Sequence, residues 1–437
     1  MSTVSRLPGI VTTDHVFQVP LDHRAPDGEQ IELYAREVVA PGRAHDDLPW
    51  LVYLQGGPGG KANRPLGKDG WLTRALDDYR VLLLDQRGTG RSTPATRQTL
   101  ARRGDARQQA EYLAHFRADS IVRDAELVRH RLLGPDGRWS LLGQSFGGFC
   151  TLTYLSLAPE GLREAFVTGG LAGLRRSADE VYRAAYPRVA RKNAGHYRRF
   201  PQDVAAVRRI AAHLADRPAT LPDGGTLTVE AFQALGMMLG SGTGSFSLHY
   251  LLEEAWVDGA AGPELSDTFL AGAQAQLSFA QGPLYAVLHE SIYGQRSVDG
   301  RGTEWSAERV RKEFPEFDAA QALADDRPVL FTGEMIYPWM FETDPSLRPL
   351  RETAQLLAER TDWSDLYDTE RLAANEVPVF AAVYHDDMYV DTAHSLETAD
   401  AVANTRVWVT NEWEHDGLRV SGGGVLDRLI RMAQGEI

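Results

Sequence analysis

The chain has 437 residues, of which 43% are hydrophobic and 24% are charged, as in an ordinary globular protein. Its formal net charge of −14 argues against nucleic acid as a partner, because an acidic surface repels a polyanion. No apolar run resembles a signal peptide or approaches the roughly 20 residues that span a bilayer, and the single cysteine suits a reducing compartment, so we expect a cytoplasmic protein without a membrane partner.

Strand-like and helix-like segments alternate over the first 170 residues. Residues 16–22 and 31–40 alternate apolar and polar side chains, as half-buried strands do. The runs LPWLVYLQ and YRVLLLDQ are continuously apolar, as in strands covered on both faces. A helix capped by Asp119 and ended by Gly134 precedes a further strand, WSLLGQS. This alternation predicts an α/β fold with a mostly parallel central sheet flanked by helices.

The pattern changes in the middle of the chain and returns near its end. Helical stretches rich in Ala, Arg and Glu dominate from about residue 171 to residue 324. Strand character returns at VPVFAAVYHDD and TRVWVTNEWEH, before a closing helix, whereas RPVLFTGEMIYPWMF is ambiguous. We therefore expect a core made of residues 1–170 and 325–437, interrupted by a mainly helical cap over residues 171–324.

A candidate nucleophile lies in GQSFG, a G-x-S-x-G match centred on Ser145. An apolar strand precedes the match and a helical pattern follows it, which is the context of a nucleophile elbow. The flanking glycines allow the serine to occupy a strained turn and to project its hydroxyl above the sheet edge. A plain Gly/Ser turn that opens a helix is the alternative interpretation.

A serine nucleophile needs a base and an orienting acid, which follow it in the order acid, then His, in folds of this class. VYHDDMYV ends one predicted strand in carboxylates, and the next strand ends at His415, our candidate base. Either Asp386 or Asp387 could orient it, and His385 is a rival base. A metal site formed by these two histidines and two aspartates is a weaker alternative, because it lacks metal-ligand spacing and leaves the serine unexplained.

The glycine-rich segment QGGPGG follows the strand LPWLVYLQ and bears very little side chain. Attack on a carbonyl creates an oxyanion that requires preorganised N–H donors. In this fold class one donor is the residue after the nucleophile, here Phe146, and another lies in the loop after an earlier strand. We assign Gly57 as the second donor. The alternative is an ordinary surface loop.

With these residues in place, the chain resembles the proline iminopeptidases, serine peptidases of the α/β-hydrolase fold. GGPGG, DQRGTGRS and GQSFGG are similar to three of that family's motifs, in the same order. HDDMYV is similar to the family's G-R-x-D-M strand end, in which the aspartate before Met is the triad acid, and this selects Asp387. The sequence departs at Gln55, where the family usually has His before the glycines, and the acid strand end lacks the family's Gly.

The resemblance implies release of N-terminal proline from short peptides through an acyl-enzyme, with no metal or organic cofactor. It also implies cap glutamates that bind the substrate's ammonium group. HESIY is similar to the family's I-E-x-x-Y stretch, which makes Glu290 the first candidate, with Tyr293 beside it. Glu253 or Glu254 in HYLLEEAW, and Glu334 in FTGEMIYPW, are the others.

Two other kinds of function are compatible with the sequence. An esterase, an amidase or a broader aminopeptidase would keep the same nucleophile, because fold analogy does not fix substrate. A catalytically silent hydrolase fold acting as a binding module is less favoured, since the serine, an acid and the histidine are all retained. The sequence does not predict an oligomeric state.

Overall fold

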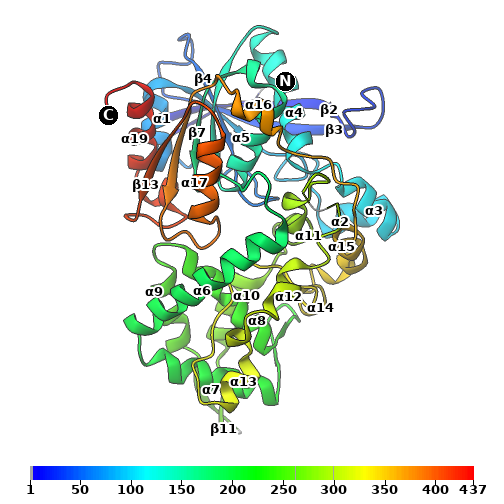
Figure 1. The fold of residues 1–437 in the computed structure, drawn as a ribbon, viewed down its shortest axis with the longest axis vertical. Coiled ribbons are helices and arrows are strands. Elements are labelled where there is room, and N and C mark those ends of the chain that lie inside the picture. Colours follow the sequence, from blue (N-terminus) through cyan, green and yellow to red (C-terminus); the bar gives the residue numbers. More distant parts are fainter. Residues whose placement is uncertain (1–2, 261, 299) are drawn as a thin grey trace.

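The computed structural model describes residues 3–260, 262–298 and 300–437. In these residues a nine-stranded sheet forms the centre of the core, in the order β1-β2-β3-β5-β4-β6-β7-β12-β13. The strands are β1 (Val4–Leu7), β2 (Ile10–Pro20), β3 (Gln30–Val39), β4 (Trp50–Leu54), β5 (Arg80–Leu84), β6 (Trp139–Gln144), β7 (Leu162–Thr168), β12 (Val379–Tyr384) and β13 (Thr405–Thr410). Figure 1 shows this sheet at the top of the molecule and a helical region below it.

The pairing pattern confirms the predicted α/β-hydrolase fold class. β4, β5, β6, β7, β12 and β13 pair in parallel with their neighbours in that set, whereas β1, β2 and β3 form an antiparallel edge that joins β5. The central strands β4 and β6 are almost entirely buried, as their apolar composition predicts. In a parallel sheet the carboxyl ends of the strands meet at one edge, which is where ligands bind.

Helices cover both faces of the sheet and position the elbow. The main ones are α1 (Gly70–Asp78), α4 (Ala118–Leu133), α5 (Phe146–Leu157), α17 (Thr392–Ala401) and α19 (Gly424–Ala433). α4 ends at Gly134, as predicted, but its N-cap is Arg117, so the expected cap at Asp119 is wrong: Asp119 lies within the first turn. The apolar stripe of its sequence is Ile121, Ala125, Val128 and Leu132, of which the first three are buried and Leu132 is partly buried. α5 is buried along nearly its whole length because helices and strands surround it.

The residues between β7 and β12, which we call the cap region, are mostly helical. Its longer helices are α6 (Ala178–Arg199), α7 (Asp203–Asp216), α9 (Gly244–Glu253), α10 (Asp267–Leu277) and α15 (Arg351–Ala358). It also contains two short antiparallel hairpins, β8 (Ala219–Thr220) with β9 (Thr226–Leu227) and β10 (Trp256–Gly259) with β11 (Gly262–Leu265). The ambiguous run at 327–341 is an irregular segment that leads into the short helix α14 (Met340–Thr343). The division into a core and a cap at residues 170 and 324 stays a prediction.

The cap region contacts the core beside the carboxyl ends of the strands. A Cβ atom built on Gly59 would lie 2.7 Å from the Cβ of Leu284, so the glycine loop after β4 packs directly on α11 (Leu284–Leu288). Across the same boundary, Lys192 forms an ion pair with Glu414 and Arg188 forms one with Asp391. Among the described residues, no helix combines the length and apolar character needed to cross a membrane.

Candidate active site

Ser145 lies in a strained turn between β6 and α5. Its φ of 54° and ψ of −123° lie in a region that residues with a side chain rarely adopt. The turn is tight because Gly147 packs against β4: a Cβ atom there would lie 1.9 Å from the carbonyl oxygen of Leu54. The backbone N–H of Ser145 donates to the carbonyl of Thr168, at 3.0 Å, and anchors the turn to β7. This is the geometry of the predicted elbow.

His415 and Asp387 form a buried hydrogen-bonded pair. The distance between His415 Nδ1 and Asp387 Oδ2 is 2.7 Å, and the two residues are 7% and 1% exposed. The other carboxylate oxygen, Oδ1, accepts the backbone N–H groups of Tyr389 and Val390, at 2.8 and 3.0 Å, which fixes the carboxylate. The neighbouring Asp386 is exposed and pairs with His385 instead. The structure therefore brings Asp387, rather than Asp386, to His415.

Two consecutive glycines after β7 connect this pair to the elbow. A Cβ atom on Gly169 would lie 3.0 Å from His415 Nδ1 and 3.2 Å from Asp387 Oδ2. One on Gly170 would lie 2.4 Å from the carbonyl oxygen of Ser145. The backbone of these two glycines thus lies against His415 and Asp387 at one residue and against the backbone of Ser145 at the next. These glycines were not predicted, although TGG directly after a buried strand is visible in the sequence.

The charges around His415 favour its protonated form. Burial alone would lower the pKa of the imidazole, but the charge and hydrogen bond of Asp387, together with the charge of Glu334, raise the pKa above its ordinary value. An imidazole whose pKa is raised in this way is a stronger base when it is neutral. It is also better able to hold a proton that it has accepted from a hydroxyl group.

The glycine loop lies against the elbow, as an oxyanion site requires. A Cβ atom on Gly56 would lie 2.9 Å from the Cβ of Ser145, and Gly57 has a φ of +136°, which favours glycine. Gln55, at the position where the resembled family has His, accepts a hydrogen bond from the Tyr53 hydroxyl at 2.9 Å. Phe146 is the first residue of α5, so its N–H has no partner within the helix. The two predicted donors therefore lie on adjoining segments beside Ser145.

Glu334 is the predicted cap glutamate whose charge acts on the His–Asp pair. It raises the pKa of His415. Burial raises the pKa of Glu334 itself, and the charge of Asp387 adds to this effect while the charge of His415 opposes it. Its Oε1 accepts a hydrogen bond from the hydroxyl of Tyr285. The ring of Tyr389 packs edge-on against His415, at 4.7 Å between centroids. Glu334, Tyr285 and Tyr389 are each partly exposed, so solvent reaches this group.

Glu290 occupies a different position, at the start of α12 (Ser306–Arg311). Its two carboxylate oxygens accept the backbone N–H groups of Ser306 and Ala307, at 3.0 and 2.9 Å. Burial raises its pKa to about 7, although these hydrogen bonds favour the charged form. Tyr293, three residues on, packs its ring on Phe149 at 6.0 Å. The structure thus shows Glu290 as a buried cap of a helix.

Glu253 and Glu254 lie at the far end of α9 from the core. The backbone N–H of Gly242, just before α9, donates to Asp416 at 3.1 Å, next to His415. The helix spans Gly244–Glu253, so the two glutamates lie about 15 Å further along its axis. Both are exposed, and Glu253 forms an ion pair with His249 at 3.2 Å. The structure does not bring them to the His–Asp pair.

Among the described residues, no group of three or more His, Cys, Asp or Glu side chains has the arrangement of a metal site. His385 and Asp386 point into solvent, whereas Asp387 and His415 are buried. What the site offers chemically is a strained serine, a buried imidazole–carboxylate pair, two backbone N–H groups and one nearby carboxylate.

Comparison with known proteins gives similarity over nearly the whole chain. The chain is 53% identical over 427 residues to the proline iminopeptidase of Aeromonas sobria, covering 98% of this chain and 97% of that protein. It is 38% identical to the proline iminopeptidase aneH of Aspergillus aculeatus, covering 98% and 94%. A family model described as the alpha/beta hydrolase fold matches residues 49–225. A solved structure of the proline iminopeptidase of Mycobacterium smegmatis aligns at 15% identity with a TM-score of 0.47, covering 96% of this chain and 98% of that one.

Proposed function

We propose that this chain, which belongs to the proline iminopeptidase family, is a serine aminopeptidase that releases N-terminal proline from short peptides. The two curated relatives confirm the family resemblance that was inferred from the motifs. The observation that carries the proposed chemistry is the buried pair of His415 and Asp387, 2.7 Å apart, beside a strained serine and a backbone amide loop.

In the proposed reaction, His415 accepts the proton of Ser145 as its Oγ attacks the prolyl carbonyl. Asp387 orients the imidazole and stabilises its positive charge, and the N–H groups of Phe146 and Gly57 stabilise the oxyanion. His415 then protonates the leaving amine. Water, deprotonated by the same imidazole, hydrolyses the prolyl ester and regenerates the serine.

We assign recognition of the free amine to Glu334. A carboxylate near the reacting carbonyl attracts an ammonium group and so favours substrates whose N-terminus is free. Glu334 interacts electrostatically with His415 and Asp387, whereas the oxygens of Glu290 already accept two backbone N–H groups. We infer that Glu290, with Tyr293 beside it, supports the wall of the substrate site from behind, and that Glu253 and Glu254 have no part in binding the amine.

The cap region supports short peptides, rather than folded proteins, as the substrates. Ser145 is only 8% exposed, and the cap region packs on the glycine loop beside it, which favours short peptides over folded proteins. We also place the enzyme in the cytoplasm, because Cys150 is its single cysteine and a reducing compartment suits such a chain.

The test is the hydrolysis of chromogenic amides of proline and alanine and of a simple ester by the wild-type protein. The proposal expects the prolyl amide to be preferred, and Ser145→Ala to remove the activity. Ester turnover without prolyl turnover would favour the esterase interpretation. Absence of turnover on every substrate would favour a silent binding module.

A further inference from the structure

Helix α6 of the cap region lies against the two loops that carry the proposed acid and base. Figure 1 shows this helix between the sheet and the rest of the cap region. The loop after β12 carries Asp387, and the loop after β13 carries His415. Arg188 and Lys192 of α6 form ion pairs with these two loops, one each. Residues four apart lie on the same face of a helix, so a single face of α6 meets both loops.

Arg188 contacts the loop of Asp387 at several points. Its Nε atom donates to Oδ2 of Asp391, which is the N-cap of α17. Its Nη1 atom donates to the carbonyl oxygens of His385 and Asp387, at 3.2 and 3.3 Å, and to Oγ1 of Thr392 at 3.3 Å. The side chains of Arg188 and Asp391 are both largely buried. The planar guanidinium group therefore joins the two ends of the loop, which a single ammonium group cannot do.

The position of the Asp387 carboxylate depends on the shape of this loop. Residues 385–391 belong to no strand or helix. Oδ1 of Asp387 accepts the backbone N–H groups of Tyr389 and Val390 within the loop, while Oδ2 lies 2.7 Å from Nδ1 of His415. A change in the path of the loop would therefore turn the carboxylate away from the imidazole. Arg188 opposes such a change, because it binds the carbonyl group of Asp387 itself.

The loop of His415 is also held from the cap region. The ammonium group of Lys192 pairs with the carboxylate of Glu414, the residue before His415. The backbone N–H of Gly242 donates to Oδ1 of Asp416, the residue after it, at 3.1 Å. Contacts from the cap region thus flank the imidazole on both sides along the chain.

The adjoining face of α6 holds the segment that carries Glu334. The side-chain amide of Asn193 donates to the carbonyl of Phe331 at 2.9 Å and accepts the N–H of the same residue at 2.8 Å. A Cβ atom on Gly333 would lie 2.6 Å from the side chain of Val189. One helix therefore supports both the proposed amine site and the loops of the His–Asp pair, on neighbouring faces.

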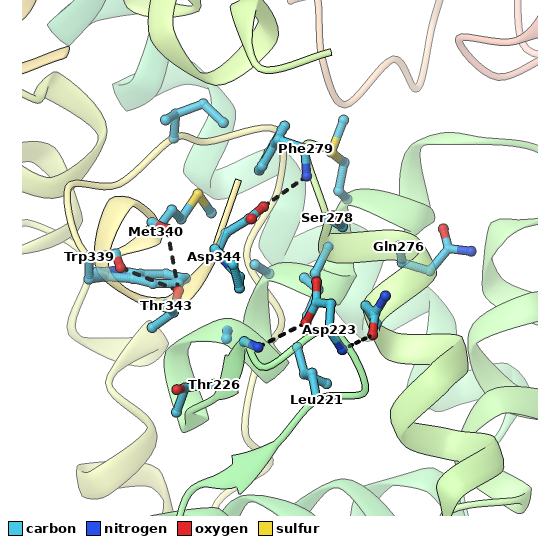
Figure 2. A pocket seen from close by; sticks show the side chains of 18 of the residues that line it. Leu221, Asp223, Thr226, Gln276, Ser278, Phe279, Trp339, Met340, Thr343 and Asp344 are labelled. Atoms are coloured by element: carbon cyan, nitrogen blue, oxygen red, sulfur yellow. Dashed lines mark hydrogen bonds between the residues drawn. The ribbon is translucent and has the colours of Figure 1, made fainter. Parts of the chain in front are cut away.

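The segment of Glu334 has a further support that is separate from Arg188. Farther along the chain it lines the pocket in Figure 2, where the carboxylate of Asp344 accepts the backbone N–H of Phe279 at 2.8 Å. Phe279 stacks on Tyr285, which donates to Glu334, with 5.8 Å between the ring centroids. A change at Arg188 should therefore leave the amine site in place.

We propose that Arg188 is a positioning residue for the triad: it fixes the loop of Asp387 from the cap region and so keeps the carboxylate aligned with the imidazole of His415. Lys192 supports the loop of His415 from the same face of α6. The effect of Arg188 on the rate of hydrolysis rests on the proposed function, whereas its effect on the hydrogen bond between His415 and Asp387 does not.

The first test follows that hydrogen bond by proton NMR of the full-length protein without substrate. A proton held between an imidazole and a carboxylate resonates at the low-field end of the spectrum, provided that it exchanges slowly with water. We expect this signal in the wild type, and its absence from Asp387→Asn identifies it. Arg188→Met should lose or broaden the signal. Arg191→Met is the matched control, because that arginine is exposed on the same helix, and it should keep the signal.

The second test separates positioning from the general stability of the cap region. With the 4-nitroanilide of L-proline, Arg188→Met should lower kcat by about 10-fold and leave KM unchanged, because the acid is displaced while the amine site is not. Arg188→Lys keeps a positive charge beside Asp391 but loses the planar fork. It should unfold at nearly the same urea concentration as the wild type and still lower kcat by about 10-fold.

Three results would overturn the role of Arg188. These are an unchanged low-field signal in both Arg188 variants, a wild-type kcat in Arg188→Lys, and a raised KM with an unchanged kcat in Arg188→Met. A low-field signal that depends on Arg188 in a protein that releases no proline would support the positioning role and refute the proposed function alone.

Discussion

The core and the cap region hold their functional groups in different ways. In the core, Ser145, Asp387 and His415 follow three parallel strands, β6, β12 and β13, whose register the backbone hydrogen bonds fix. In the cap region, Glu334 lies on an irregular segment and is positioned by side-chain contacts such as that with Tyr285. Under the proposed function, bond-breaking belongs to the part held by strand register, and recognition of the substrate's amine belongs to the part held by side-chain contacts. Core variants should therefore change kcat, whereas variants of the cap glutamates should change KM or stability.

The largest effect is expected for the acid of the core. Asp387→Asn keeps the shape of the side chain but loses the charge that stabilises the imidazolium, and kcat for a prolyl amide should fall by about 10⁴-fold. Asp386→Asn is the matched control, because Asp386 is exposed and pairs with His385, and its kcat should stay within about twofold of the wild type. Equal losses in the two variants would remove Asp387 from its proposed role.

The second effect concerns recognition in the cap region. Glu334→Gln removes the charge that we assign to the ammonium group, so kcat/KM for a free-amine prolyl amide should fall by about 10- to 100-fold, mostly through KM. Hydrolysis of an N-blocked prolyl ester should change little. Glu253→Gln is the control, since that exposed residue lies at the far end of α9. If blocked and free substrates lost activity equally, Glu334 would have no special relation to the amine.

A smaller effect on stability should distinguish Glu290 from Glu334. Glu290→Ala leaves two backbone N–H groups at the start of α12 without acceptors, at a cost of about 2 kcal/mol in the free energy of unfolding, measured with urea. Glu254→Ala, at an exposed position, should change this free energy by less than about 0.5 kcal/mol. A stable Glu290→Ala protein with a raised KM would reverse the roles that we assign to the two residues.

The stability contribution of Glu290 should also depend on pH in a definite direction. Its pKa in the folded protein is about 7, above the ordinary value of 4.5, so the folded state holds this proton more tightly than the unfolded state does. The wild type should therefore lose stability as the pH rises from about 4.5 to about 7, relative to Glu290→Ala, when both are unfolded with urea at each pH. A stability difference that is independent of pH across this window would contradict the raised pKa.

The smallest expected effect is a shift in the pH profile. His415 must be neutral to act as a base, so kcat/KM should rise with pH through its raised pKa. Because Glu334 contributes to raising that pKa, the rise in kcat/KM should occur at lower pH in Glu334→Gln when an N-blocked ester is the substrate. In Glu253→Gln the rise should occur at the same pH as in the wild type. A shift to higher pH in Glu334→Gln would contradict the electrostatic account.

The sequence indicated the core more fully than the cap region, for a physical reason. Strand ends of a parallel sheet converge whatever the intervening loops do, so Ser145 and His415 could be assigned from the strand pattern. The choice of Asp387 over Asp386 needed the family motif, because two adjacent carboxylates on an extended segment are equivalent in a pattern.

The position of a cap glutamate follows from packing between distant segments, which no local pattern reveals. The I-E-x-x-Y resemblance favoured Glu290, but whether its carboxylate meets a ligand or a helix end depends on where Ser306 and Ala307 begin α12. The role of Gly169 and Gly170 escaped prediction for the same reason, since a glycine pair signals a close approach without naming its partner.

Labelling with a fluorophosphonate, followed by peptide mass spectrometry, tests the central claim most directly, because it reports the core chemistry without any need for amine recognition. The account predicts an adduct on Ser145 in the wild type and in Glu334→Gln, and a loss of labelling in His415→Ala. An unlabelled Ser145 in a wild-type protein that hydrolyses prolyl amides, or undiminished labelling without the imidazole, would contradict it.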